Sequence, residues 1–74
     1  MESIERYLFE LTFEDGTVKV LKCEKVGSEW RFDDFTITEP YTDIVVDELK
    51  NETEHLESIT VYKVECKYYW GDSK

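Results

Sequence analysis

Residues 5–22, ERYLFELTFEDGTVKVLK, contain the pattern that decides the fold. The first part of this stretch alternates between apolar and polar residues, which is typical of a strand with one buried face. Its apolar side consists of Tyr7, Phe9, Leu11 and Phe13. Asp15 and Gly16 follow, the strongest short signal for a hairpin turn, and TVKVLKCEKV supplies the returning strand. The sequence therefore predicts an antiparallel hairpin.

The length of the loop sets the register of this hairpin. A two-residue Asp-Gly turn pairs Phe13 with Val18, so that apolar residues meet across the strands. A three-residue loop instead sets Lys19 opposite Leu11. We expect the two-residue turn for this reason. The apolar residues that it leaves on the opposite face are Leu8, Leu21 and Cys23.

A second tight turn is predicted at Gly27 and Ser28, because glycine suits the first central position of a type II′ hairpin. This turn places Glu24 opposite Arg31, a cross-strand pair of opposite charges. A third strand therefore follows the second one directly.

On this third strand, Trp30 and Phe32 join the second face, beside the apolar residues left there by the first hairpin. Residues 33–34 are two aspartates. Before them the apolar residues occupy even-numbered positions, and after them the apolar residues Phe35 and Ile37 occupy odd-numbered ones. We interpret this change as a β-bulge at the two aspartates.

Residues 38–57, TEPYTDIVVDELKNETEHLE, are compatible with two structures. Thr38, Glu39 and Pro40 resemble a helix start, and the apolar residues that follow are spaced as one helical stripe. That stripe consists of Tyr41, Val45, Leu49 and Leu56. The β-branched run at 44–46 favours a fourth strand instead. We expect the helix.

Residues 58–70 alternate again and predict a long final strand. The expected fold is a single α+β domain over residues 1–74, with a small antiparallel sheet. Its elements are a three-stranded meander, one helix and one long C-terminal strand.

The charge of the chain excludes several classes of partner. Its 18 acidic and nine basic residues give a net charge of −9, which repels nucleic acids and anionic membranes. A basic protein is the partner that long-range attraction favours, and proteins that handle nucleic acids carry the commonest basic surfaces. The sequence lacks a long apolar run and a secretory signal, so we expect a cytoplasmic protein.

No pattern of catalytic or metal-binding residues is present in the sequence. His55 is the only histidine, and Cys23 and Cys66 fall inside predicted strands, where cysteine usually acts as a small apolar residue. Their spacing matches no zinc motif, and the acidic residues do not follow the order of a calcium loop. We therefore expect free thiols, no cofactor, no metal and no enzymatic activity.

In size and acidity the chain resembles small phage-encoded inhibitors of host defence nucleases, such as anti-CRISPR proteins, and acidic immunity proteins that neutralise nuclease toxins. This resemblance implies stoichiometric inhibition of a basic, nucleic-acid-handling protein, with carboxylates in place of phosphates. The residues expected to bind the partner are Glu39, Asp43, Asp47, Glu48, Glu52, Glu54, Glu57, Trp30, Tyr69 and Trp70.

The alternative hypothesis is a dimeric structural or adaptor module. In that case an apolar second face of the sheet mediates assembly, and the acidic residues only keep the protein soluble. This face is expected to be centred on Leu8, Leu21, Trp30 and Phe32.

Overall fold

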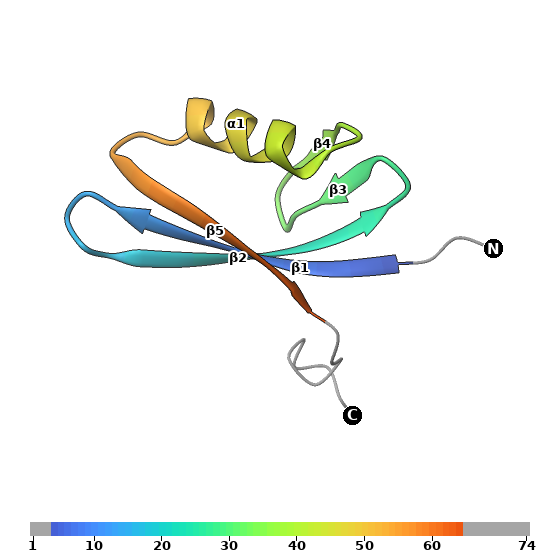
Figure 1. Cartoon of the computed structure of the whole chain (residues 1–74), viewed down its shortest axis with the longest axis horizontal. Coiled ribbons are helices and arrows are strands. Elements are labelled where there is room, and N and C mark those ends of the chain that lie inside the picture. The colour runs from blue at the N-terminus through green and yellow to red at the C-terminus, as the bar shows by residue number, and fades with distance from the viewer. Residues whose placement is uncertain (1–3, 65–74) are drawn as a thin grey trace.

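A computed structural model describes residues 4–64, which form a five-stranded antiparallel sheet and, within that range, one helix (Figure 1). The elements in chain order are β1 (Ile4–Phe13), β2 (Val18–Val26), β3 (Glu29–Arg31), β4 (Thr36–Thr38), α1 (Thr42–Glu52) and β5 (Leu56–Val64). The expected α+β class is confirmed. The meander, however, has four strands rather than three.

The strands lie in the order β4-β3-β2-β1-β5. Each strand of the meander pairs with the one before it, and β5 then pairs with β1 on the other side. The chain therefore has to cross from one edge of the sheet to the other between β4 and β5. It does so through α1, which lies over one face of the sheet (Figure 1). We call this covered face the inner face and the opposite one the outer face.

The first hairpin has the three-residue loop, so the register expected from the sequence is wrong. Leu11 pairs with Lys19. The Phe13 amide donates to the Thr17 carbonyl oxygen at 2.9 Å, and the Gly16 amide donates to the Phe13 carbonyl oxygen at 2.9 Å. Gly16 has a φ of 90°, as the glycine after a type I turn requires in such a loop. The Asp15 carboxylate accepts hydrogen bonds from the amide and the hydroxyl of Thr17, which stabilises the turn.

The actual register moves two residues from the second face to the inner face. Leu21 pairs with Phe9, and Cys23 pairs with Tyr7, so all four lie on the side of the helix. Lys19 also points to that side, but at its exposed rim. The physical reason is that one helix covers one face, so the fold is most stable when the large apolar side chains gather there.

The second hairpin follows the sequence prediction. Glu24 pairs with Arg31, and Gly27 has a φ of 62°, the positive value that its position in the turn requires. The same pairing sets Trp30 opposite Lys25 on the inner face. The expected position of Trp30 on the second face is therefore wrong.

Residues 33–34 form a third turn rather than a bulge. Trp30 pairs with Ile37 across β3 and β4, and the Phe32 amide donates to the Phe35 carbonyl oxygen at 2.8 Å. The rings of Phe32 and Phe35 stack with centroids 4.7 Å apart and planes 13° apart. The change of parity in the sequence thus comes from a reversal of the chain.

The core lies between the inner face and α1. Val45 and Leu49 of the helix are buried, as the stripe predicted, whereas Tyr41 at the start of the helix is exposed. The buried apolar residues are Phe9, Leu11, Cys23, Trp30, Phe32, Ile37, Val45 and Leu49. The strand alternative for the 44–46 run is excluded.

Trp30 is the centre of this core. Its side chain is 0% exposed, and its indole N–H donates to the Glu39 carbonyl oxygen at 2.8 Å, just before the helix. Its ring lies 5.1 Å from that of Tyr7 and 6.1 Å from that of Phe9. Trp30 therefore connects β3, β1 and the entry to α1.

The outer face of the sheet carries apolar residues of its own. Ile4, Val18, Val20 and Tyr62 are each about half exposed there. Polar pairs separate them, such as Arg6 with Glu24 at 3.4 Å and the Tyr62 hydroxyl with Glu10 at 3.3 Å. Of the residues expected at the centre of the second face, Leu8 alone lies on it.

Candidate functional site

The helix holds four of the predicted partner-binding carboxylates in two pairs. Val45 and Leu49 face the core, and because successive residues are 100° apart around a helix, Asp43 and Asp47 lie on the opposite side. Glu48 and Glu52 lie on one flank of the helix and line a groove described below. All four carboxylates are exposed. We call Asp43 and Asp47 the outer pair and Glu48 and Glu52 the flank pair.

The other three carboxylates of the acidic stretch lie apart from these pairs. Glu39 is half-buried before the helix, where its amide donates to the Ser28 carbonyl oxygen at 3.0 Å. Glu54 is exposed in the turn after the helix, beside His55. Glu57 is exposed near the start of β5, where the pairing with β1 shifts register. The acidic stretch is therefore one charged region but not one plane.

Among residues 4–64, no carboxylate of the outer or flank pair forms an ion pair. The ion pairs there are Arg6 with Glu24 and Arg31 with Glu29, and in addition His55 Nδ1 lies 3.7 Å from a Glu14 carboxylate oxygen. The negative charge of α1 is thus not neutralised by neighbouring side chains of the described chain. Lys50 is the basic residue in the last turn of the helix, where its positive charge interacts favourably with the negative end of the helix dipole.

The three aromatic residues of the predicted site do not add to this surface. Trp30 is part of the core and leaves no side-chain surface for a partner. Tyr69 and Trp70 lie outside the described residues.

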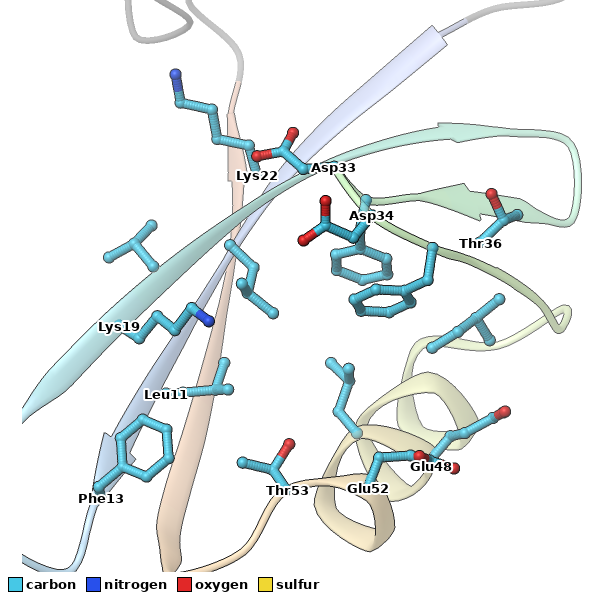
Figure 2. Close-up of a pocket in the computed structure, with 16 residues that line it drawn as sticks. Leu11, Phe13, Lys19, Lys22, Asp33, Asp34, Thr36, Glu48, Glu52 and Thr53 are labelled. Carbon is cyan, nitrogen blue, oxygen red and sulfur yellow. The ribbon is translucent and has the colours of Figure 1, made fainter.

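A groove lies between residues 19–22 of β2, the β3–β4 turn and the second half of α1 (Figure 2). Its volume is about 530 Å³, within the usual range for ligand sites. The apolar lining includes Leu11, Phe13, Leu21, Phe32, Phe35, Ile37 and Leu49. Local sequence patterns do not predict this groove, because it depends on how far β3 pairs along β2.

The rim of the groove is charged. Figure 2 shows the flank pair on the side of the helix and Asp34 on the side of the β3–β4 turn, with Lys19 on β2 across from them. The charged lining residues are Lys19, Lys22, Asp33, Asp34, Glu48 and Glu52. Four carboxylates thus meet two ammonium groups, so the groove has the same sign as the whole chain.

The candidate nucleophiles lie apart from this region. Burial raises the pKa of the Cys23 thiol to about 12, so the thiol is neutral at physiological pH. His55 is exposed at the far end of the first hairpin, with its Nδ1 3.7 Å from a Glu14 carboxylate oxygen. Within residues 4–64, no cluster of histidine, cysteine and acidic side chains has the arrangement of a metal site. Nor does that part of the chain contain a helix whose length and apolarity would suit a membrane span.

Comparison with known proteins identifies no family for this chain: no protein-family model, no curated protein and no solved structure matches it.

Proposed function

We propose that the protein acts by stoichiometric binding and inhibits a basic protein that handles nucleic acids. The observation that carries this proposal is the set of exposed carboxylates on α1, none of which has an ion-pair partner among the described residues. A rigid helix holds them at fixed spacing, about 6 Å along the axis for residues four apart. Carboxylates spaced in this way are able to accept hydrogen bonds from arginine and lysine side chains that otherwise hold phosphates.

The net charge of −9 supports the same proposal. Opposite charge on the two partners accelerates their encounter, and salt screens that attraction. The complex is therefore expected to form quickly and to weaken as ionic strength rises.

The test compares two variants with equal net charge. Asp43→Lys with Asp47→Lys reverses the outer pair, and Glu14→Lys with Glu29→Lys makes the same change of charge away from the helix. Each protein, immobilised, is used to capture proteins from a lysate at low salt. The wild type and the Glu14/Glu29 variant are expected to retain a basic nucleic-acid-binding protein that high salt releases, and the Asp43/Asp47 variant is expected to lose it.

Inhibition is measured by titrating the captured protein in its own nucleic-acid-binding or cleavage assay. Activity is expected to fall linearly to an end point at a fixed molar ratio. Equal capture by both variants would show that only total charge matters and would contradict a binding role for the helix. Capture without any loss of activity would contradict inhibition.

A dimeric structural or adaptor module is the second candidate, and one observation favours it. Ile4, Val18, Val20 and Tyr62 are exposed on the outer face, which no described element covers. Sedimentation equilibrium of Val20→Lys with Tyr62→Ser measures this directly, because these changes are expected to dissociate such a dimer without disturbing the core. Trp30 and Leu21 are unsuitable for this test, since both lie on the inner face.

A further inference from the structure

The two halves of β2 differ in their neighbours. On the side away from β1, β3 pairs only with Glu24, Lys25 and Val26. Within the described residues no strand pairs with that side of β2 before residue 24. The first half of β2 is thus an internal sheet edge, and it forms one wall of the groove.

The backbone groups of Val18 and Val20 point away from β1, and Val20 is one of the residues that line the groove. The Phe13 amide donates a hydrogen bond to the Thr17 carbonyl oxygen, so the odd-numbered residues of the two strands are the ones that hydrogen-bond to each other across the hairpin. Because hydrogen-bonding direction alternates along an antiparallel strand, the even-numbered residues of β2 direct their N–H and C=O groups away from β1. The same parity applies to Glu24 and Val26, which do pair with β3. Val20 therefore presents a donor and an acceptor to whatever enters the groove, and Val18 presents the same groups further along the same edge.

The charge of the groove indicates which kind of chain would enter it. A second copy of this protein, added edge to edge, would bring Lys19 and Lys22 of both copies together, and each copy carries a charge of −9. Lysines on a strand edge are a common device against such self-pairing. On the opposite wall, Asp34 and the flank pair attract positive charge. A basic extended segment is complementary to the backbone edge and to the acidic rim.

We propose that the groove binds an extended segment of the basic partner, which adds to the sheet as a strand beside Val18 and Val20. This inference rests on the proposed function and names the structure that the partner supplies. On the side facing the helix, an apolar side chain of the segment contacts Leu21 and Leu49, and an arginine or lysine two residues away reaches Glu48 and Glu52. Backbone bonds to the edge supply affinity, and these two side-chain positions supply specificity.

A peptide titration tests this proposal. The probe is the capped peptide Thr-Val-Thr-Arg-Thr-Val-Thr, whose valine and arginine side chains share one face when it is extended. It is added to isotope-labelled wild-type protein, and backbone amide shifts and hydrogen exchange are followed by NMR. The amides of Val18 and Val20 are expected to shift and to gain protection from exchange. Unchanged exchange at both amides, with the peptide bound, would overturn strand addition.

Two substitutions at Val20 separate the backbone from the side chain. Val20→Pro removes an N–H that points to the groove and leaves the hydrogen bonds to β1 in place. Val20→Thr keeps that N–H and the preference for a strand. The proline variant is expected to bind the peptide about tenfold more weakly than the threonine variant, which corresponds to the loss of about one hydrogen bond. Equal binding by two folded variants would overturn the proposal, and the exchange measurement on the wild type remains decisive if the proline variant does not fold.

The charged rim has its own variant. Glu48→Gln with Glu52→Gln is expected to weaken the peptide about tenfold and to reduce the salt dependence, whereas Asp43→Asn with Asp47→Asn is expected to change it less than about twofold. Two outcomes separate this inference from the proposed function. If capture of the basic protein requires the outer pair but is equally strong with the Val20→Pro variant, strand addition is wrong and the proposed function stands. If the peptide binds as described but no basic protein is captured, the proposed function fails, and a segment of a basic partner is no longer supported as the occupant of the groove. A dimer that Val20→Pro dissociates and Val20→Thr leaves intact would identify a second copy as the occupant and contradict a basic segment.

Discussion

Two neighbouring residues of β2, Val20 and Leu21, show how differently the two faces of the sheet are used. Leu21 contacts the buried cluster beneath α1, whereas Val20 is 52% exposed on the outer face. Both are aliphatic, and both lie in the same strand. Apolar character alone therefore does not place a residue in the core. A residue stabilises this fold when the helix covers it, and the outer face remains available for other contacts.

The largest expected difference in stability between the two faces is that between alanine substitutions at Trp30 and at Tyr62. Trp30→Ala is expected to remove about 3–5 kcal/mol, as for other buried large-to-small substitutions. A domain of this size has a total stability of about 3–5 kcal/mol, so this variant is expected to be largely unfolded. Tyr62→Ala on the outer face is expected to cost less than about 1 kcal/mol. Urea unfolding followed by circular dichroism measures both, and similar losses at the two positions would contradict the difference between the faces.

The reactivity of cysteine sharpens the same comparison. In a Cys66→Ser background, Cys23 is expected to resist alkylation by iodoacetamide at pH 8, because burial raises its pKa to about 12 and excludes the reagent. The matched variant adds Cys23→Ser and Val20→Cys, which places the single thiol on the outer face. That thiol is expected to react about a thousandfold faster, as its larger thiolate fraction requires. Equal rates in the folded proteins would contradict the burial of Cys23.

The raised pKa also predicts a dependence of stability on alkaline pH. The thiol pKa is higher in the folded than in the unfolded chain, so the neutral thiol contributes stability that is fully present below pH 9.0. This contribution is lost as the pH rises through the folded pKa of about 12. Cys23→Ala is expected to show a shallower fall in unfolding free energy over this window, and an identical slope would contradict the assignment.

The loop of the first hairpin sets which residues of β2 lie on which face, and substitutions in it are expected to have a smaller effect on stability. Gly16 has a φ of 90°, and a Cβ added there would meet no other group within 4 Å. Gly16→Ala is therefore expected to cost about 1–2 kcal/mol through backbone strain alone. Gly16→Asn is expected to cost less, because asparagine tolerates positive φ better. Thermal unfolding compares the two, and an alanine variant as stable as the wild type would argue against the three-residue loop.

The smallest effect is expected for Val20→Thr. This residue is half exposed on the outer face, so the variant is expected to change stability by less than about 0.5 kcal/mol. The same substitution at Leu21 is expected to cost more than about 1 kcal/mol, since it removes apolar contacts from the core. Urea unfolding of the two variants decides whether neighbours in one strand differ in this way.

Local patterns in the sequence predicted most of the elements. The alternation in β1, the glycine turn at Gly27 and the helical stripe through Val45 and Leu49 each depend on residues close together in the chain. The register of the first hairpin does not follow from the apolar pairs next to its turn, because burial beneath the helix outweighs them. Counting the large apolar residues on each face would have favoured the three-residue loop, which places Trp30, Phe9 and Leu21 on one face.

The candidate site was predicted in part. The exposed carboxylates of the helix follow from its amphipathic pattern, and their position opposite Val45 and Leu49 needed no tertiary information. Trp30 was misassigned to the surface because its face depends on two successive registers. The groove beside β2 was missed, since it exists only because β3 ends at Arg31 and the chain turns back at the next residues.

The sequence alone specified the class of fold, the acidic helix and the positions of the two glycine turns, because periodicity, charge and turn chemistry act over a few residues. Only the tertiary structure shows which face is buried, that Trp30 is the centre of the core, and that β3 pairs with just the last three residues of β2. These features arise from competition among pairings far apart in the chain. Burial beneath a single helix selects the arrangement that covers the most apolar surface.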